Sequence, residues 1–252
     1  MLTKKFSEKK MMLAGIHAIE EALLANKAFR KVFIQRDNKN PQIKKIEQIC
    51  RNNNINIVFV PKEKLSRMTS VVHQGIVGLL SAVEFTDVET LVQTLFEKGI
   101  NPVFAYLDRI SDVRNFGAIV RSALFCGIDA VIVPMKNSAD INEEALKTSA
   151  GALMNIPLCQ VSNPVNFLKF LKNSGFQLVA ADEKAKENLA KADFSLPTCI
   201  ILGSESVGID KNLLRYIDKQ VKIDGSGQFD SLNVSVAAGI FFYEAMKNRK
   251  NE

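Results

Sequence analysis

The sequence has few of the residues from which metal centres and disulfide frameworks are built. It contains only two histidines, His17 and His73, which do not pair at metal-ligand spacing, so we expect no zinc or other metal site. Its four cysteines lie far apart, form no Cys-x-x-Cys pair and stand next to apolar residues. This pattern predicts reduced thiols in the core of a cytoplasmic protein.

Long apolar runs are also absent. No stretch approaches the roughly 20 residues that span a bilayer, so we expect no transmembrane helix and no membrane partner. The Lys-rich start at 1–10 is followed by an apolar stretch that His17 and Glu20 interrupt. That stretch is too short and too polar for a signal peptide. The chain has no low-complexity segment and no internal repeat.

Charge, by contrast, is present and unevenly distributed. The 252 residues are 47% hydrophobic and 24% charged, which is typical of a globular protein. Residues 1–83 hold 15 Lys+Arg against 6 Asp+Glu (net +9), and residues 84–252 hold the other 18 against 21 (net −3). A basic part on an acidic remainder indicates a polyanion-binding module joined to a domain with another task. A basic surface that is merely solvated would give the same count, so charge alone leaves both interpretations open.

Apolar periodicity predicts two α/β parts with an ordered connector between them. In residues 1–83 helices and strands alternate, as in a small α/β sandwich. A single apolar stripe within 84–101 predicts a connector helix, which Gly99 and Pro102 end. From 102 to 252, buried strands alternate with helices, which indicates a parallel sheet. The strands are expected at 31–34, 55–60, 75–80, 103–107, 130–133, 178–181, 199–202 and 221–223, and the helices after 15 and 41 and at 62–68, 115–126, 141–149, 164–173 and 233–248.

Three segments carry glycines and polar residues directly after predicted strands, where open α/β sheets bind ligands. They are residues 107–121, 201–209 and 223–237. Taken alone, each has an ordinary structural explanation. Asn115 would cap the helix it begins, and Arg121 would form a solvent-facing ion pair. The glycines at 203 and 208 would be turn glycines, and Ser231 or Asn233 would cap the last helix.

Together and in this order, the three segments resemble the motifs of the SpoU/TrmH family of RNA ribose 2′-O-methyltransferases, in the SPOUT superfamily. The matching runs are Asn-x-Gly-x-x-x-Arg at 115–121, Gly-x-Glu-x-x-Gly at 203–208 and Ser-Leu-Asn-Val-Ser at 231–235. Val113 stands where the first motif usually has Pro, and Ser206 where the second commonly has Gly. Ser206 would be strained only if its backbone needs a positive φ. Neither departure removes a reactive side chain.

The N-terminal part resembles the RNA-binding domain of the subgroup that methylates a guanosine of 23S rRNA, a domain of the L7Ae/L30e type. The resemblance rests on Gly-Ile-His-Ala at 15–18 with Glu20, and on His-Gln-Gly-Ile at 73–76. It implies an RNA-binding domain at 1–83, a connector helix at 84–101 and a SPOUT catalytic domain at 102–252, with a trefoil knot from about 198 to 248. The phosphate-contact candidates are Arg30, Lys31, Arg36, Lys44, Lys45, Arg51, Lys62, Lys64 and Arg67.

The resemblance also implies S-adenosylmethionine as the cofactor, bent and met mostly by backbone groups in the knot loops. Such binding would account for the lack of a Gly-x-Gly-x-x-Gly signature. The cofactor-binding candidates, by position, are Leu202, Gly203, Ile223, Leu232, Val234 and Ala237. The apolar ones would sandwich the adenine, and Gly203 would allow close backbone approach.

The catalytic candidates implied by the resemblance are Arg121, Asn115, Glu205, Ser231 and Asn233. Family accounts favour the arginine as the group that activates the ribose hydroxyl. Because arginine stays protonated far above pH 7, we expect Arg121 to stabilise the developing alkoxide. Asn115 would orient the hydroxyl or Arg121, and Glu205 would fix the arginine or bind substrate. The other two would shape the cofactor loop and help to place the ribose.

The expected function is S-adenosylmethionine-dependent 2′-O-methylation of a ribose in RNA, with a guanosine of 23S rRNA as target. The family builds its active site at a homodimer interface, for which the last helix offers an apolar stripe at 240–246. One alternative is a tRNA ribose methyltransferase, which the N-terminal extension disfavours. Another is a non-catalytic RNA-binding assembly protein of the same fold, against which the intact Asn115, Arg121 and Glu205 argue.

Overall fold

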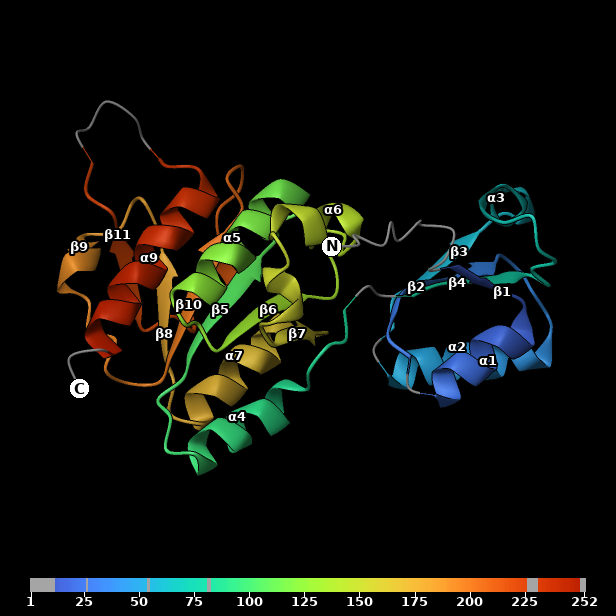
Figure 1. Cartoon of the computed structure of the whole chain (residues 1–252), viewed down its shortest axis with the longest axis horizontal. Helices are drawn as coiled ribbons and strands as arrows, with labels where there is room; N and C mark the ends of the chain where they lie inside the picture. The colour runs from blue at the N-terminus through green and yellow to red at the C-terminus, as the bar shows by residue number, and fades with distance from the viewer. Residues whose placement is uncertain (1–11, 26, 54, 81–82, 226–230, 250–252) are drawn as a thin grey trace, which may run out of the picture. The chain divides into compact units, whose positions relative to one another are not determined.

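The computed structural model describes residues 12–25, 27–53, 55–80, 83–225 and 231–249, which form two compact α/β units (Figure 1). The first unit comprises the described residues up to Glu84, and the second nearly all of those from Phe85 on. Every helix and strand that the periodicity predicts is present in one unit or the other.

The first unit is a four-stranded sheet with helices on both faces. Its strand order is β1-β4-β2-β3, with β2 and β3 parallel and β4 antiparallel to both of its neighbours. Two helices bury Ile19, Ile43 and Ile46 against one face, and the third buries Leu65 against the other. The elements are β1 (Met12–Ala14), α1 (Ile16–Leu24), β2 (Phe29–Gln35), α2 (Pro41–Asn52), β3 (Ile57–Val60), α3 (Lys62–Met68) and β4 (Ile76–Leu80).

The second unit is built on a parallel sheet of seven strands in the order β7-β6-β5-β10-β8-β11-β9. The expected α/β class, with a small N-terminal domain and a parallel-sheet domain, is therefore confirmed. The knot that the resemblance implies stays a prediction. The strands are β5 (Val103–Asp108), β6 (Ala130–Pro134), β7 (Leu158–Val161), β8 (Gln177–Ala181), β9 (Glu187–Asn188), β10 (Thr198–Gly203) and β11 (Lys219–Lys222).

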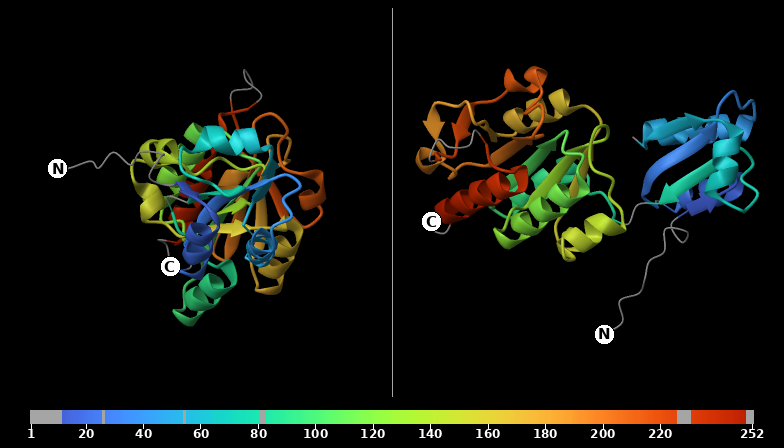
Figure 2. Two further views of the ribbon diagram at one scale, coloured as in Figure 1. Left: turned by 90° about the vertical axis from the view of Figure 1, so that its right-hand side faces the viewer. Right: turned by 90° about the horizontal axis from the view of Figure 1, so that it is seen from above.

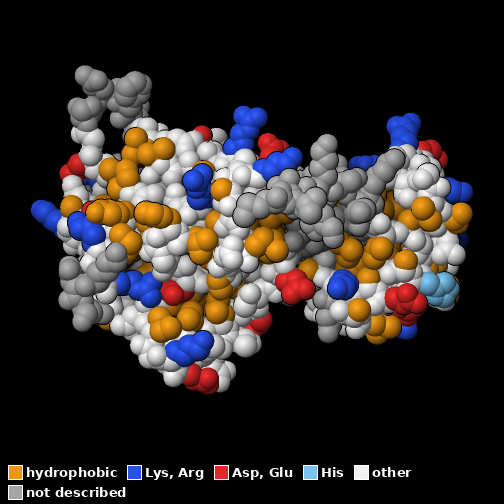
Figure 3. Space-filling view, viewed as in Figure 1, with side chains coloured by type: hydrophobic (Ala, Val, Ile, Leu, Met, Phe, Trp, Pro, Cys, Tyr) orange, Lys and Arg blue, Asp and Glu red, His pale blue; other side chains and the backbone are white. Residues whose placement is uncertain are grey.

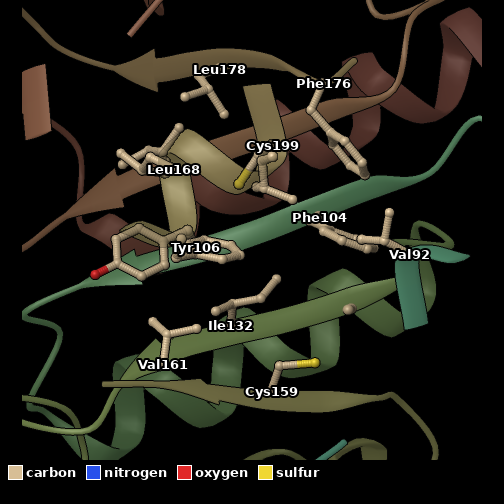
Figure 4. Packing of buried hydrophobic residues seen from close by; sticks show 14 of the residues in the cluster. Val92, Phe104, Tyr106, Ile132, Cys159, Val161, Leu168, Phe176, Leu178 and Cys199 are labelled. Atoms are coloured by element: carbon tan, nitrogen blue, oxygen red, sulfur yellow. The ribbon is translucent and has the colours of Figure 1, made fainter. Parts of the chain in front are cut away.

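Helices cover both faces of this sheet, as Figure 2 shows from above. The core on one face includes Val92 of α4 and Leu168 of α7 (Figure 4). Leu213 of α8 belongs to the same cluster. On the opposite face α5 packs along α9. The helix expected as a connector thus contributes to the core of the second unit. The helices are α4 (Val88–Glu97), α5 (Val113–Phe125), α6 (Glu143–Thr148), α7 (Pro164–Asn173), α8 (Lys211–Leu214) and α9 (Val234–Arg249), with short 3₁₀ turns at Ala152–Met154 and Leu189–Lys191.

All four cysteines are buried free thiols. Burial raises the pKa of the Cys50 thiol to about 11 and that of Cys159 to about 12, because a thiolate is poorly solvated in the core. Both thiols therefore stay protonated near neutral pH. In the part of the chain that the structure describes, no group of three or more His, Cys, Asp or Glu side chains is placed to hold a metal ion. No described helix is long and apolar enough to cross a membrane.

Candidate active site

Three side chains from three different segments meet beyond the carboxyl ends of β5 and β10. Asn115 Nδ2 donates to Glu205 Oε1 at 3.2 Å, and Asn233 Nδ2 lies 3.0 Å from Asn115 Oδ1. Asn233 Nδ2 also donates to Glu205 Oε1. These residues come from the start of α5, the loop after β10 and the residue before α9. The structure therefore brings one polar side chain of each motif into a single hydrogen-bonded cluster.

Local capping explains why these side chains are available to one another. Asp112 caps α5, because its Oδ1 accepts from the N–H groups of Arg114 at 2.9 Å and Asn115 at 2.8 Å. The Asn115 side chain is thereby free to reach Glu205. Asn233 Oδ1 accepts from the Ser235 N–H at 2.9 Å, so Asn233 caps α9 with its oxygen and uses its amide nitrogen in the cluster.

Glu205 also interacts with the first turn of α9. Its Oε1 accepts from the Val234 N–H at 3.1 Å. A carboxylate is favoured at a helix N-terminus, where the unpaired N–H groups carry partial positive charge. Oε2 of Glu205 makes no hydrogen bond with any described residue and stays available as an acceptor.

Gly203 is required because the loop after β10 folds back onto it. A Cβ at this position would lie 2.3 Å from Gly208 C and 2.4 Å from Ile209 N, both backbone atoms. Gly208 itself has a φ of 68°, which favours glycine, and it pairs with Ser204 in an isolated bridge. Ser206 is not among the described residues with positive φ, so this departure from the family pattern introduces no strain of that kind.

Gly117, the glycine of the first motif, is needed for the packing of α6 against α5. A Cβ there would lie 2.0 Å from Thr148 Oγ1, which sits against α5 and donates to Glu144 O at 2.8 Å. The motif glycine therefore allows the end of α6 to approach the helix that carries Asn115.

Two of the predicted catalytic residues lie outside the cluster. Arg121 is exposed on α5 and makes no hydrogen bond or ion pair with any described residue. It is six residues from Asn115, and at about 100° per residue the two lie on different faces of the helix. Ser231 is exposed and makes no hydrogen bond to Asn115, Glu205 or Asn233.

The predicted cofactor-binding residues lie at the end of β10, directly after β11, and just before and within the first turn of α9. Leu202 and Val234 are buried; Leu202 can offer only backbone atoms at this edge, and the Val234 N–H is already bound to Glu205. Gly203, Ile223 and Ala237 are half-buried, and Leu232 is 47% exposed. Val207, which the sequence interpretation missed, is 66% exposed in the loop that carries Glu205. The sequence feature that could have identified Val207 is its position as an apolar residue in a loop bounded by two glycines.

The sequence interpretation also missed an ionic network beside the cluster. Asp108, at the end of β5, is only 3% exposed, and its Oδ2 accepts from Asp210 N at 2.7 Å and Arg109 Nε at 3.3 Å. Burial raises the pKa of the Asp108 carboxyl, opposed by these two donors. The sequence feature that could have identified this network is the pair of Asp108 and Arg109, an acid and a base that directly follow the predicted strand at 103–107.

Each of the two units matches a known protein family. The SpoU rRNA Methylase family matches residues 102–243. The chain belongs to this family. A second family, described as "RNA 2'-O ribose methyltransferase substrate binding", matches residues 12–86. The resemblance drawn from the three motifs is confirmed, and the chain is a SpoU/TrmH-type RNA methyltransferase.

Curated relatives cover the chain almost from end to end. A putative TrmH family tRNA/rRNA methyltransferase of Bacillus subtilis is 29% identical over 96% of this chain and 98% of its own length. Another of that name, from Staphylococcus saprophyticus, is 30% identical over 96% of this chain and 97% of its own. Both names leave the class of RNA open.

Solved structures share the fold. The SpoU methyltransferase AviRb of Streptomyces viridochromogenes, crystallised with AdoMet, superposes with a TM-score of 0.61 at 20% identity, covering 100% of this chain and 96% of that one. The TrmH/SpoU tRNA modifying enzyme of A. aeolicus is 30% identical with a TM-score of 0.55, over 65% of this chain and 84% of that one.

Proposed function

We propose that this SpoU-family protein transfers a methyl group from S-adenosylmethionine to the 2′-hydroxyl of a ribose in RNA, with a guanosine of 23S rRNA as the target. The observation that carries the proposal is the cluster of Asn115, Glu205 and Asn233 at the carboxyl edge of the sheet. The substrate-binding match over residues 12–86 supports an RNA substrate, and the description of the SpoU rRNA Methylase family supports a ribosomal one.

The residues at this edge fit S-adenosylmethionine. Leu232 and Val207 are exposed apolar side chains that a flat adenine would cover, and the backbone at 202–203 offers polar groups beside them. Gly203 would keep that backbone accessible, and Ile223 and Ala237 would complete the apolar lining. The bound cofactor supplies a methyl group on a sulfonium, which is an electrophilic carbon.

The protein's task is then to place the ribose and to manage the charge on its oxygen. Asn115 would donate its remaining amide hydrogen to the ribose, and Glu205 Oε2 would accept from the hydroxyl. Asn233 gives both of its amide hydrogens to Asn115 and Glu205 and would hold these two side chains in place. The hydroxyl would pass its proton to Glu205 Oε2, and its oxygen could then take the methyl group that the cofactor supplies. The Arg121 guanidinium would stabilise the negative charge on that oxygen.

We propose that Arg121 reaches the site of a partner subunit in a homodimer. Arg121 and Phe125 are one helical turn apart on α5, and Phe125 is 82% exposed. Val236 and Tyr243 of the neighbouring α9 are each 51% exposed, and hydrophobic side chains gather over these two helices in Figure 3. Phe241, in the stripe expected to form the interface, is instead buried within the subunit. A monomer in light scattering at micromolar concentration would contradict the dimer.

RNA would bind the first unit at the edge where β2 and β3 end and β4 begins. Antiparallel pairing of Ile34 with Ile76 brings the loops before and after these strands to one edge. The exposed cations there make no ion pair with described residues, unlike Lys45 and Arg51, which pair with Glu20 and Glu47. The edge cations are Arg36, Lys39, Lys62 and Lys64.

Changing these four cations to alanine is expected to weaken RNA binding and to make the affinity depend less steeply on salt concentration. Each RNA phosphate that the variant no longer neutralises should reduce the slope of log K against log salt by about one. Filter binding at several salt concentrations measures both quantities. Lys45→Ala with Arg51→Ala is the matched control and should leave the slope unchanged. An unchanged slope in the fourfold variant would place the RNA elsewhere.

Mapping 2′-O-methyl sites in total RNA from a strain lacking this gene tests the function. We expect one guanosine of 23S rRNA to lose its methyl group and to regain it when the gene is restored. Loss from a tRNA would favour the alternative that the A. aeolicus relative exemplifies. No change in any RNA would overturn methyl transfer and favour an assembly protein.

A further inference from the structure

We infer that Asp108 and Arg109 are positioning residues that clamp residues 208–210 to the end of β5 and so hold Glu205 in the cluster. The clamp itself is a statement about the fold. Only its consequence for catalysis rests on the function proposed above.

The first half of the clamp is a buried carboxylate. Asp108 is 3% exposed, and its Oδ2 receives the Asp210 N–H at 2.7 Å across 102 positions of sequence. A buried carboxylate needs hydrogen bonds to offset the hydration it gives up, so this short contact resists separation of the loop from the strand.

The second half is an arginine in an unusual backbone conformation. Arg109 has a φ of 57°, where a side chain is disfavoured and glycine is not. Its guanidinium lies 3.4 Å from Gly208 O and 4.0 Å from Asp210 Oδ2, in addition to its contact with Asp108. These three side-chain contacts thus stabilise a backbone conformation that arginine does not favour. Two of them, with Gly208 and Asp210, join Arg109 to the loop.

The loop connects this clamp to the cluster. Gly208 N donates to Ser204 O at 2.8 Å, and the peptide after Gly208 lies against Gly203. Glu205 lies within this closed turn and contacts Asn115 and Asn233. One end of the turn continues β10, and the clamp fixes the other end. Without it, the turn would lose its tie to the end of β5 and keep only β10, its own internal bond and the hydrogen bonds of Glu205, so Glu205 would sample more positions.

The variant Arg109→Gly removes the side-chain contacts of the clamp without straining the backbone, because glycine adopts a positive φ without strain. Its effect on the loop can therefore be measured apart from an effect on folding. We expect a slightly lower melting temperature, because buried Asp108 loses one of its two partners, and amide hydrogen exchange of residues 204–210 faster by about tenfold or more, with no change in 103–107. In RNA methylation, turnover should fall about 10- to 100-fold while KM for RNA is retained, since misplacing a positioned group affects turnover.

Two variants complete the experiment. Asn137→Gly is the matched control, because exposed Asn137 has a φ of 60° in the loop after β6 and lies outside the clamp. It should match the wild type in exchange and turnover. Asp108→Asn keeps an acceptor for Asp210 N but removes the charge that faces Arg109, and should give an intermediate effect.

The outcomes separate the clamp from the proposed function. Unchanged exchange of residues 204–210 in Arg109→Gly overturns the clamp whatever the activity, and so does faster exchange throughout the second unit. Faster exchange confined to residues 204–210 in Arg109→Gly supports the clamp. If the wild-type protein methylates no RNA, the proposed function is wrong and the clamp still stands. Faster local exchange with wild-type turnover would overturn the positioning role in catalysis.

Discussion

Replacing Arg121 by alanine should reduce methyl transfer by about a hundredfold to a thousandfold, the usual cost of removing a group that stabilises a developing oxyanion. Arg121 is exposed and has no described partner, so the fold should be unaffected. It makes no hydrogen bond or ion pair with the cofactor candidates among the described residues, and the S-adenosylmethionine affinity measured by calorimetry should therefore be retained. Turnover of RNA in saturating cofactor provides the rate.

Arg114→Ala is the control for general loss of positive charge. Arg114 lies seven residues earlier on the same helix, its side chain is 82% exposed, and among the described residues its side chain forms an ion pair only with Glu144, at 3.6 Å. Its removal should leave turnover within about twofold, as for an exposed ion pair. Wild-type turnover in Arg121→Ala would rule out its assignment as the catalytic arginine.

Mixing two inactive variants shows whether Arg121 acts across the dimer. In mixed dimers of Arg121→Ala and Glu205→Gln chains, a shared site can combine an intact arginine with an intact carboxylate. Random reassociation would then restore about a quarter of wild-type activity, since half of the dimers are mixed and each has one intact site. No recovery would mean that Arg121 serves its own subunit.

Gly203→Ala should remove cofactor binding and destabilise the second unit. The added Cβ would meet backbone atoms of Gly208 and Ile209 within 2.4 Å, and backbone cannot rotate away as a flexible side chain does. Overpacking of this kind costs about 1–3 kcal/mol or more. In a chain of this size, each kcal/mol lowers the melting temperature by about 2–4 °C.

Calorimetry with S-adenosylmethionine and thermal unfolding measure the two effects. Gly225→Ala is the matched control, because Gly225 lies beyond β11, has nothing within 4 Å of an added Cβ and lacks a positive φ. It should bind and unfold like the wild type. Wild-type affinity in Gly203→Ala would show that the loop yields without disturbing the cofactor site.

Much of the fold was predictable because its elements are long enough to show their own periodicity. The helix of residues 234–249 and strands such as 103–108 appear where apolar spacing placed them. Three strands of two to four residues, β1, β7 and β9, were missed, because so short a run shows little periodicity of its own. The four-residue β3 was predicted because it continues an alternating run that starts at Ile55. What makes the three missed runs strands is pairing with neighbours already in the sheet.

The site was predictable as a set of motifs, and its arrangement was not. Asn115 had a local explanation as a helix cap, which Asp112 supplies instead. The burial of Asp108 and its bond to Asp210 depend on a contact 102 positions along the chain, which no local pattern encodes. Arg121 was grouped with Asn115 by spacing, yet helical geometry puts them on different faces.

The sequence by itself determined the longer helices and strands, the basic character of the N-terminal unit and the family, because apolar period, charge and motif order are local or additive properties. Only the tertiary structure decided why Gly203 must be glycine, which asparagine joins Glu205, and that Asp108 and Arg109 hold the loop. These depend on backbone and side chains meeting across the sheet edge, and such proximity arises only when parallel strands bring their carboxyl ends together.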